Sequence, residues 1–211
     1  MKVCEIFASI QGESTYAGLP CIFVRMTGCN LRCTYCDTTY AYDEGSEMTV
    51  GEIIDAVRSC GLNLVEITGG EPLLQRDART LISGLLDLDF KVLIETNGSA
   101  DIGEVDRRAI IIMDVKTPGS GMSDSIRIEN LSLLKKSDEL KFVITNEADY
   151  DWARAVVRQF RLSEKCTVLF SPVYGKLSPS ELSKWIIADK LPVRMNLQLH
   201  KYIFSPNQRG V

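Results

Sequence analysis

The stretch LVEITGGEPLLQRDARTLISGLLDLDFKVLIETNG, residues 64–98, sets a pattern that repeats along the chain. It opens with a short apolar run over residues 64–68, continues with an amphipathic stretch of helical period over 77–88, and closes with a second apolar run over 92–96. Short continuous apolar runs are typical of strands that are covered on both faces, as in parallel sheets. The stretch therefore predicts a strand, a helix and a second strand parallel to the first.

The same alternation continues over nearly the whole length of the chain. Strands are predicted at residues 3–8, 21–27, 110–115, 140–145, 167–171 and 193–199, and helices at 53–60, 146–160 and 178–189. Thr49 and Glu52 form a capping-box pattern before the first of these helices. Pro179 follows Ser178 as the first helical residue follows an N-cap. Alternating strands and helices predict an α/β protein with a mainly parallel sheet.

The chain length selects among the folds of this class. A complete (β/α)8 barrel averages about 250 residues, whereas this chain has 211 residues. We therefore predict an open, incomplete (β/α)6-type barrel, a partial TIM barrel, that forms a single domain over residues 1–211. A doubly wound sheet is the alternative, but the first strand-to-helix turn lacks the GxGxxG pattern.

Composition limits the partners and the compartment. Lys and Arg number 24 against 28 Asp and Glu, so the basic excess typical of nucleic-acid binders is missing. No apolar run approaches the roughly 20 residues of a membrane span, and the N-terminus has no apolar signal-peptide core. The 7 cysteines are an odd number, which argues against a disulfide framework, and the 1 histidine excludes sites that need two. We expect a cytoplasmic protein without nucleic-acid or membrane partners.

One irregular segment, about residues 28–48, contains Cys29, Cys33 and Cys36 in a CxxxCxxC pattern. Long loops inside compact domains are usually functional. Three thiolates within so short a segment can bind one inorganic centre. Cysteines that only pack in a core would sit in apolar runs, and structural zinc needs a fourth ligand that the segment lacks. An iron–sulfur cluster with one iron left open is therefore favoured.

The CxxxCxxC pattern at the end of a predicted strand, with Tyr35 before its last cysteine, resembles the radical S-adenosylmethionine superfamily. The resemblance implies a 4Fe–4S cluster bound by the three cysteines. It also implies S-adenosylmethionine on the open iron, held through its methionyl amino and carboxylate groups, and a 5′-deoxyadenosyl radical formed after one-electron reduction. The TGGEP motif at residues 68–72 resembles the superfamily's site for the cofactor amino group, where Glu71 could accept a hydrogen bond from the ammonium.

Several short motifs in a fixed order narrow the resemblance. They are IQGES at residues 10–14, CDT at 36–38, TGGEP at 68–72, DVKTP at 114–118 and QLHKY at 198–202. Together they resemble the 7-carboxy-7-deazaguanine synthase family over nearly the full chain. That resemblance implies conversion of 6-carboxytetrahydropterin to 7-carboxy-7-deazaguanine, with hydrogen abstraction at C6, ring contraction, loss of ammonia and use of Mg2+. It also implies a homodimer and an electron donor such as flavodoxin or ferredoxin.

The resemblance also assigns roles residue by residue, with the radical supplied by the cofactor. Thr38 would bind Mg2+. Cofactor contacts would come from Tyr35, Cys36, Asp37, Gly70, Glu71, Asp114, Val115, Lys116 and Ser171. Substrate contacts would come from Ile10, Gln11, Gly12, Glu13, Arg25, Thr68, Gln198, His200 and Pro206. Arg25 would pair with the substrate carboxylate, and a structural role for His200 remains the alternative.

Two other functions compete with this one. A radical enzyme that forms a glycyl radical on a partner protein would share the cluster, but the IQGE segment and Arg25 favour a small anionic substrate. A non-catalytic iron–sulfur or zinc module would need four protein ligands. The remaining cysteines are instead expected to be buried small apolar side chains: Cys4, Cys21, Cys60 and Cys166.

Overall fold

A 9-stranded sheet forms the centre of the computed structural model, which describes residues 1–206 and 208–211. The strands are β1 (Lys2–Ile10), β2 (Pro20–Met26), β3 (Ser46–Glu47), β4 (Leu64–Gly69), β5 (Lys91–Thr96), β6 (Ile110–Val115), β7 (Glu139–Ile144), β8 (Thr167–Pro172) and β9 (Arg194–Met195). Their spatial order is β3-β1-β2-β4-β5-β6-β7-β8-β9. All neighbouring pairs from β2 to β9 are parallel, whereas β1 is antiparallel to both β2 and β3.

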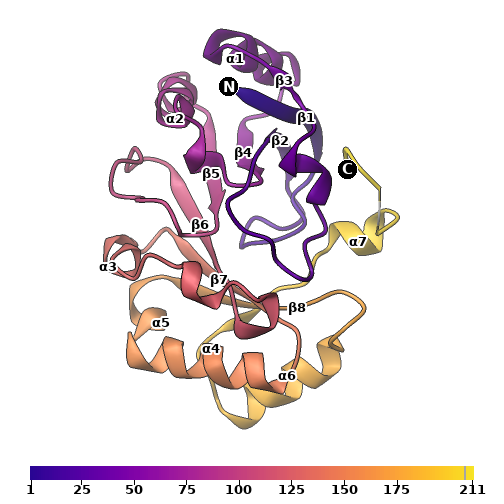
Figure 1. The fold of residues 1–211 in the computed structure, drawn as a ribbon, viewed down its shortest axis with the longest axis vertical. Coiled ribbons are helices and arrows are strands. Elements are labelled where there is room, and N and C mark those ends of the chain that lie inside the picture. Colours follow the sequence, from indigo (N-terminus) through magenta and orange to yellow (C-terminus); the bar gives the residue numbers. More distant parts are fainter. Residues whose placement is uncertain (207) are drawn as a thin grey trace.

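The sheet curves around a central space and carries its main helices on the outside (Figure 1). The helices are α1 (Val50–Ser59), α2 (Ala78–Leu86), α3 (Asn130–Leu133), α4 (Glu147–Gln159), α5 (Leu162–Lys165), α6 (Pro179–Ala188) and α7 (His200–Ile203). The parallel strands β2, β4, β5, β6, β7 and β8 are followed by the short β9, which leaves the barrel open. The predicted incomplete (β/α)6-type barrel is confirmed.

Two of the predicted helix starts differ in how they are capped. The Thr49 side chain accepts from the Glu52 N–H at 3.2 Å, and the Glu52 carboxylate accepts from the Thr49 N–H at 2.7 Å. The predicted capping box is therefore present at the start of α1. Helix α6 begins at Pro179 as predicted, but the Ser178 side chain makes no capping hydrogen bond.

The strand predicted over residues 193–199 is wrong beyond its first half, because β9 contains only Arg194–Met195. After the Asn196 N–H donates to the Phe170 carbonyl oxygen at 2.9 Å, the chain leaves the sheet and forms α7. The Leu199 N–H then donates to the Gly12 carbonyl oxygen at 2.8 Å. The segment is therefore held by the residues that follow β1 instead of by β8.

Side chains alternate between the two faces of the parallel strands. Outward residues such as Val65, Ile67 and Phe142 join one large apolar core with the helices. A second, smaller apolar cluster on the other face consists of Cys21, Phe23, Leu64, Leu93 and Ile112. Farther along the same face toward the C-terminal strand ends, the side chains that reach the cavity described below are polar: Arg25, Glu66, Thr68, Glu95, Asp114 and Lys141. The barrel interior thus has an apolar base and a polar upper layer.

The C-terminal segment returns to the N-terminal half of the chain, so that α7 and the C-terminus lie on the same side of the barrel as β1 and β2 (Figure 1). Arg209 pairs with Glu44 at 2.9 Å, and its guanidinium lies 3.7 Å from the centroid of the Tyr40 ring. These contacts place the tail against the cysteine-containing loop. None of the helices in the described part of the chain has the length and apolar character needed to cross a bilayer.

Candidate active site

A cavity of about 700 Å³ opens at the C-terminal ends of the parallel strands. Active sites of barrels of this type lie at that end, because the loops that follow the strands converge there. The predicted site residues that line the cavity are Ile10, Gln11, Gly12, Glu13, Arg25, Cys29, Cys33, Tyr35, Cys36, Asp37, Thr38, Thr68, Gly70, Asp114, Lys116, Gln198, His200 and Pro206. Segments far apart in the sequence therefore contribute to one site.

Three predicted cofactor residues do not line this cavity: Glu71, Val115 and Ser171. The Val115 side chain belongs to the outer core, and the Ser171 hydroxyl accepts from Asn196 Nδ2 at 3.0 Å. The buried Glu71 carboxylate accepts from the Leu73 N–H at 3.0 Å and from the Asn97 N–H at 2.6 Å. Side-chain contacts of these residues with a cofactor remain predictions that the geometry does not favour.

The three cysteines of the loop are half-buried free thiols on the cavity wall. Burial raises the pKa of the Cys33 thiol, whereas the nearby Lys116 ammonium lowers it. The net pKa lies above the ordinary value, so the thiol keeps its proton until a metal displaces it. Among the described residues, no three His, Cys, Asp or Glu side chains are grouped closely enough to hold one metal ion. The three thiols fit a multi-iron cluster, whose cysteines bind different irons.

The loop is fixed from both sides by hydrogen bonds. Arg32 Nη1 donates to the Cys29 carbonyl oxygen at 2.8 Å, and the same guanidinium lies 4.1 Å from the centroid of the Tyr42 ring. On the other side, the Thr34 N–H donates to the Ser120 carbonyl oxygen at 3.0 Å. A ligand set that is held in advance loses less conformational freedom when it binds a metal.

The two glycines after β4 bring backbone against backbone. Gly69 has φ 129°, in the region that favours glycine. A Cβ on Gly70 would lie 2.0 Å from the Gly28 carbonyl oxygen, just before the first cysteine of the loop. The Glu71 N–H donates to the same oxygen at 2.8 Å. Only glycine at position 70 allows the β4 turn to approach the loop this closely.

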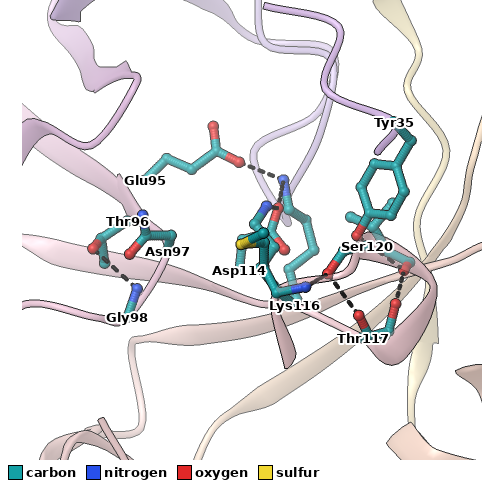
Figure 2. Close-up of polar contacts among 12 residues, drawn as sticks. Tyr35, Glu95, Thr96, Asn97, Gly98, Asp114, Lys116, Thr117 and Ser120 are labelled. Carbon is teal, nitrogen blue, oxygen red and sulfur yellow. Dashed lines mark hydrogen bonds and ion pairs between the residues drawn. The ribbon is translucent and has the colours of Figure 1, made fainter. Parts of the chain in front are cut away.

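Asp114 and Lys116 lie at the end of β6, between Glu95 and Tyr35 (Figure 2). Lys116 Nζ is 3.0 Å from Asp114 Oδ2. Burial lowers the pKa of Lys116, but Asp114 and Tyr35 raise it further, so the ammonium stays charged. Asp114 Oδ1 is buried without a hydrogen-bond partner in the described part of the chain. Buried acceptors rarely stay unsatisfied, so this oxygen fits a ligand donor such as a hydroxyl or an ammonium.

Arg25 already has a protein carboxylate beside it. Its Nε donates to Glu5 Oε1 at 2.7 Å, and the Tyr40 hydroxyl donates to the same oxygen at 2.9 Å. An arginine in an apolar strand is expected to have such a partner. The Arg25 side chain also lines the cavity, so its pairing with a substrate carboxylate remains a prediction.

The C-terminal segment closes one side of the cavity. Gln198 Nε2 donates to Glu13 Oε1 at 3.0 Å, and Lys201 Nζ pairs with Asp37 Oδ2 at 2.5 Å. The His200 ring packs on Gly12, where a Cβ would meet Nδ1 at 2.1 Å. Burial lowers the pKa of His200, which favours a neutral imidazole at neutral pH. The histidine therefore has a packing role, beside which a substrate contact remains a prediction.

Comparison with known proteins decides the family. The chain is 46% identical to the 7-carboxy-7-deazaguanine synthase of Chlorobaculum tepidum, over 100% of this chain and 97% of that protein. It is 45% identical to the synthase of Koribacter versatilis over 100% of both chains. A model of the radical SAM superfamily matches residues 23–115. The chain belongs to the 7-carboxy-7-deazaguanine synthase family.

Solved structures agree on the fold. QueE from Escherichia coli superimposes with a TM-score of 0.76 at 20% identity, covering 94% of each chain. SuiB from Streptococcus suis, crystallised with S-adenosylmethionine, gives a TM-score of 0.56 at 15% identity, covering 83% of this chain and 45% of SuiB. At these identities the similarity concerns the fold. Together with the family membership, it makes the chain a radical SAM enzyme with a partial barrel.

In this synthase-family chain, two charged strand residues that line the cavity have no counterpart among the sequence-based predictions: Glu66 and Lys141. Each is a charged residue between two apolar neighbours of its strand. Each also lies an even number of residues from another inward position of its strand, such as Thr68 after Glu66. Because side chains alternate with period two along a strand, this spacing was the signal that could have placed them in the interior.

Proposed function

We propose that this chain converts 6-carboxytetrahydropterin to 7-carboxy-7-deazaguanine with release of ammonia, in 7-deazapurine (queuosine) biosynthesis. The observation that carries the proposal is the convergence on one cavity of the three-cysteine loop, the Gly69–Gly70 turn and the residues that follow β1. A cavity of about 700 Å³ has room for both a nucleoside-sized cofactor and a pterin. The relatives that are 45–46% identical over the whole chain are named 7-carboxy-7-deazaguanine synthase, which supports the proposal.

In this proposal Cys29, Cys33 and Cys36 hold the 4Fe–4S cluster. When bound, the cluster supplies the electron that cleaves S-adenosylmethionine and thereby gives the radical that abstracts the C6 hydrogen. The protein binds and orients the cofactor. The backbone of the Gly70 turn would hold its amino group, and Asp114 Oδ1, which is buried without a partner in the described part of the chain, would accept from one of its donors. Lys116 supplies positive charge beside the cysteines.

On the substrate side, positive charges at the cavity wall would face the negative charge of the substrate. Arg25 and a Mg2+ ion on the Thr38 hydroxyl would neutralise the substrate carboxylate, since hard cations prefer oxygen ligands. Gln11, Glu13 and the C-terminal segment would hold the ring and keep water out. Water exclusion matters because a carbon radical must meet only its intended partner.

The proposal includes partners that the reaction needs. A one-electron donor such as flavodoxin or ferredoxin would reach the cluster from the loop side, where Arg32 and Thr34 are exposed. A homodimer would cover the open barrel, whose terminal strands β3 and β9 are 2 residues each. We place the enzyme in the cytoplasm, because its odd number of cysteines includes three that are proposed as cluster ligands.

The test is an anaerobic assay with the reconstituted, reduced protein, S-adenosylmethionine, Mg2+ and 6-carboxytetrahydropterin. We expect 7-carboxy-7-deazaguanine by mass and absorbance, and loss of iron and product in Cys33→Ala. Cys60→Ala is the matched control, because this half-buried cysteine at the end of α1 does not line the cavity. Release of 5′-deoxyadenosine without product would keep the radical chemistry and reject the substrate. Full iron content without either would favour the non-catalytic module.

A further inference from the structure

One ammonium group lies at the centre of the polar layer inside the barrel. Lys141 sits on β7 between Leu140 and Phe142, whose side chains belong to the outer core, so Lys141 points inward. Its side chain is 4% exposed. Nζ lies 2.7 Å from Glu13 Oε2 and 3.4 Å from Asp114 Oδ2. It also pairs with Glu95 Oε1. Three carboxylates from three segments thus share one cation.

Each of these carboxylates also contacts a second residue, which lies on the substrate side, on the cofactor side or in the C-terminal segment of the proposed active site. Glu13 accepts from Gln198 of the C-terminal segment at 3.0 Å. Asp114 contacts Lys116, on the cofactor side, at 3.0 Å. The remaining acid, Glu95, accepts from the Thr68 hydroxyl, on the substrate side, at 3.0 Å. The ammonium therefore connects the substrate side to the cofactor side through one layer of ion pairs.

Charge makes this arrangement dependent on Lys141. Carboxylates that converge in a low-dielectric interior repel one another unless a cation lies between them. Burial raises the pKa of Glu13, but the charge of the Lys141 ammonium and its hydrogen bond lower it more, so the carboxylate stays ionised. Without the ammonium, the acids would take up protons or move apart. Either response would change the hydrogen bonds that they offer to bound ligands.

We propose that Lys141 is a positioning residue, which holds Glu13, Glu95 and Asp114 so that substrate and cofactor bind with their reacting atoms in line. The inference rests on the proposed function and deepens it. Radical transfer needs the two reacting atoms in near contact. A site in which the substrate is held loosely still cleaves S-adenosylmethionine, but the radical then takes a hydrogen atom from a C–H bond of a side chain or buffer molecule and ends as 5′-deoxyadenosine without product. Removal of the ammonium should therefore uncouple cofactor cleavage from ring contraction.

The experiment compares Lys141→Met and Lys141→Arg with the wild type in the reconstituted enzyme. Lys135→Met is the matched control, since it removes another partly buried ammonium, paired with Asp138 at the start of β7 and outside the cavity. Three quantities are measured: the amount of 5′-deoxyadenosine per product, the affinity for the fluorescent analogue 6-carboxypterin, and the iron content with the melting temperature.

For Lys141→Met we expect about tenfold weaker analogue binding and 5′-deoxyadenosine in excess over product, with iron content unchanged. Lys141→Arg should recover most of the coupling, because it keeps the positive charge. Lys135→Met should lower the melting temperature and leave the coupling as in wild type. The inference would be overturned if Lys141→Met kept both the ratio of 5′-deoxyadenosine to product and the affinity for 6-carboxypterin within about twofold of wild type. It would also be overturned if both methionine variants changed these two quantities equally.

If Lys141→Met does not fold, the double variant Lys141→Met/Glu95→Gln removes one positive and one negative charge together. We expect this double variant to fold and still to release 5′-deoxyadenosine in excess over product. If it released as little 5′-deoxyadenosine per product as the wild type, the inference would be overturned. A wild-type enzyme that binds no 6-carboxypterin and forms no product would overturn the proposed function itself. A wild type that forms product beside a fully coupled Lys141→Met would reject the role of Lys141 alone.

Discussion

Glu66 carries a carboxyl group into the barrel interior, where it is 4% exposed and accepts from Gln11 Nε2 at 2.5 Å. Burial raises the pKa of Glu66 well above its ordinary value, and the nearby Glu95 adds to the effect. When a group has a higher pKa in the folded state than in the unfolded state, its contribution to stability is fully present below the unfolded-state pKa. That contribution is lost as the pH rises through the folded-state pKa. Stability at high pH is therefore reduced by this one group.

Glu66→Gln removes that pH dependence. Because glutamine stays neutral, we expect the variant to gain about 1 kcal/mol or more over wild type between pH 5 and pH 8, given that one pKa unit is about 1.4 kcal/mol. Urea unfolding at the two pH values measures the difference. Glu181→Gln, at an exposed position of α6, is the control. Its free energy of unfolding should differ from that of the wild type by the same amount at pH 5 and at pH 8. An equal effect of Glu66→Gln at pH 5 and pH 8 would contradict the prediction.

Gly70→Ala tests the close approach between the β4 turn and the cysteine-containing loop. The added Cβ would lie 2.0 Å from the Gly28 carbonyl oxygen, so the loop must move. We expect about tenfold weaker S-adenosylmethionine binding by equilibrium dialysis, with a barrel that still melts cooperatively. Gly51→Ala is the control, because a Cβ there meets nothing within 4 Å and alanine favours the α1 helix. Unchanged cofactor affinity in Gly70→Ala would show that the loop adapts.

At the scale of elements, the start of α1 depends on a local signal. Thr49→Ala breaks the capping box and should cost about 1 kcal/mol of unfolding free energy, with activity unchanged, because α1 lies outside the barrel. Ser178→Ala is the matched control, since the Ser178 side chain makes no capping bond at α6. Its effect should stay within about 0.5 kcal/mol. Chemical unfolding of both variants gives the comparison, and equal losses would argue against the cap.

The C-terminal tail contacts the cysteine-containing loop through Arg209. Arg209→Ala removes the pair with Glu44 and the contact with the Tyr40 ring. Because the Arg209 side chain is 52% exposed, its ion pair is screened by solvent and stability should change little. The KM for the pterin should nevertheless rise several-fold, since the tail lines the cavity. Arg108→Ala removes an equally exposed arginine, 52%, together with its ion pairs to Asp87 and Asp106 away from the cavity, and should leave KM unchanged. A KM that stays constant in Arg209→Ala would mean that the tail closes without this contact.

For the whole molecule, the parallel strands and outer helices could be predicted because each depends on local periodicity. The loop with its three cysteines on the cavity wall could be predicted because these cysteines are close in sequence. The grouping of Glu95 and Asp114 around Lys141 could not be predicted, because these side chains come together only when β5, β6 and β7 are neighbours in the sheet. The short β9 and α7 were missed for a related reason, since Leu199 bonds to Gly12 at the opposite end of the chain. The local sequence was enough to predict the structure of residues 64–98, whereas the structure of residues 196–203 depends on partners that the local sequence does not reveal.

The position of the tail over the barrel mouth has a consequence for how the enzyme matures. Residues 198–206 leave the ribosome after the cysteine loop and the strands β1 to β6. Until the tail arrives and its lysine reaches Asp37, the three thiols face an open mouth. We therefore expect iron and sulfide to reach the three thiols more easily before this segment docks than after it.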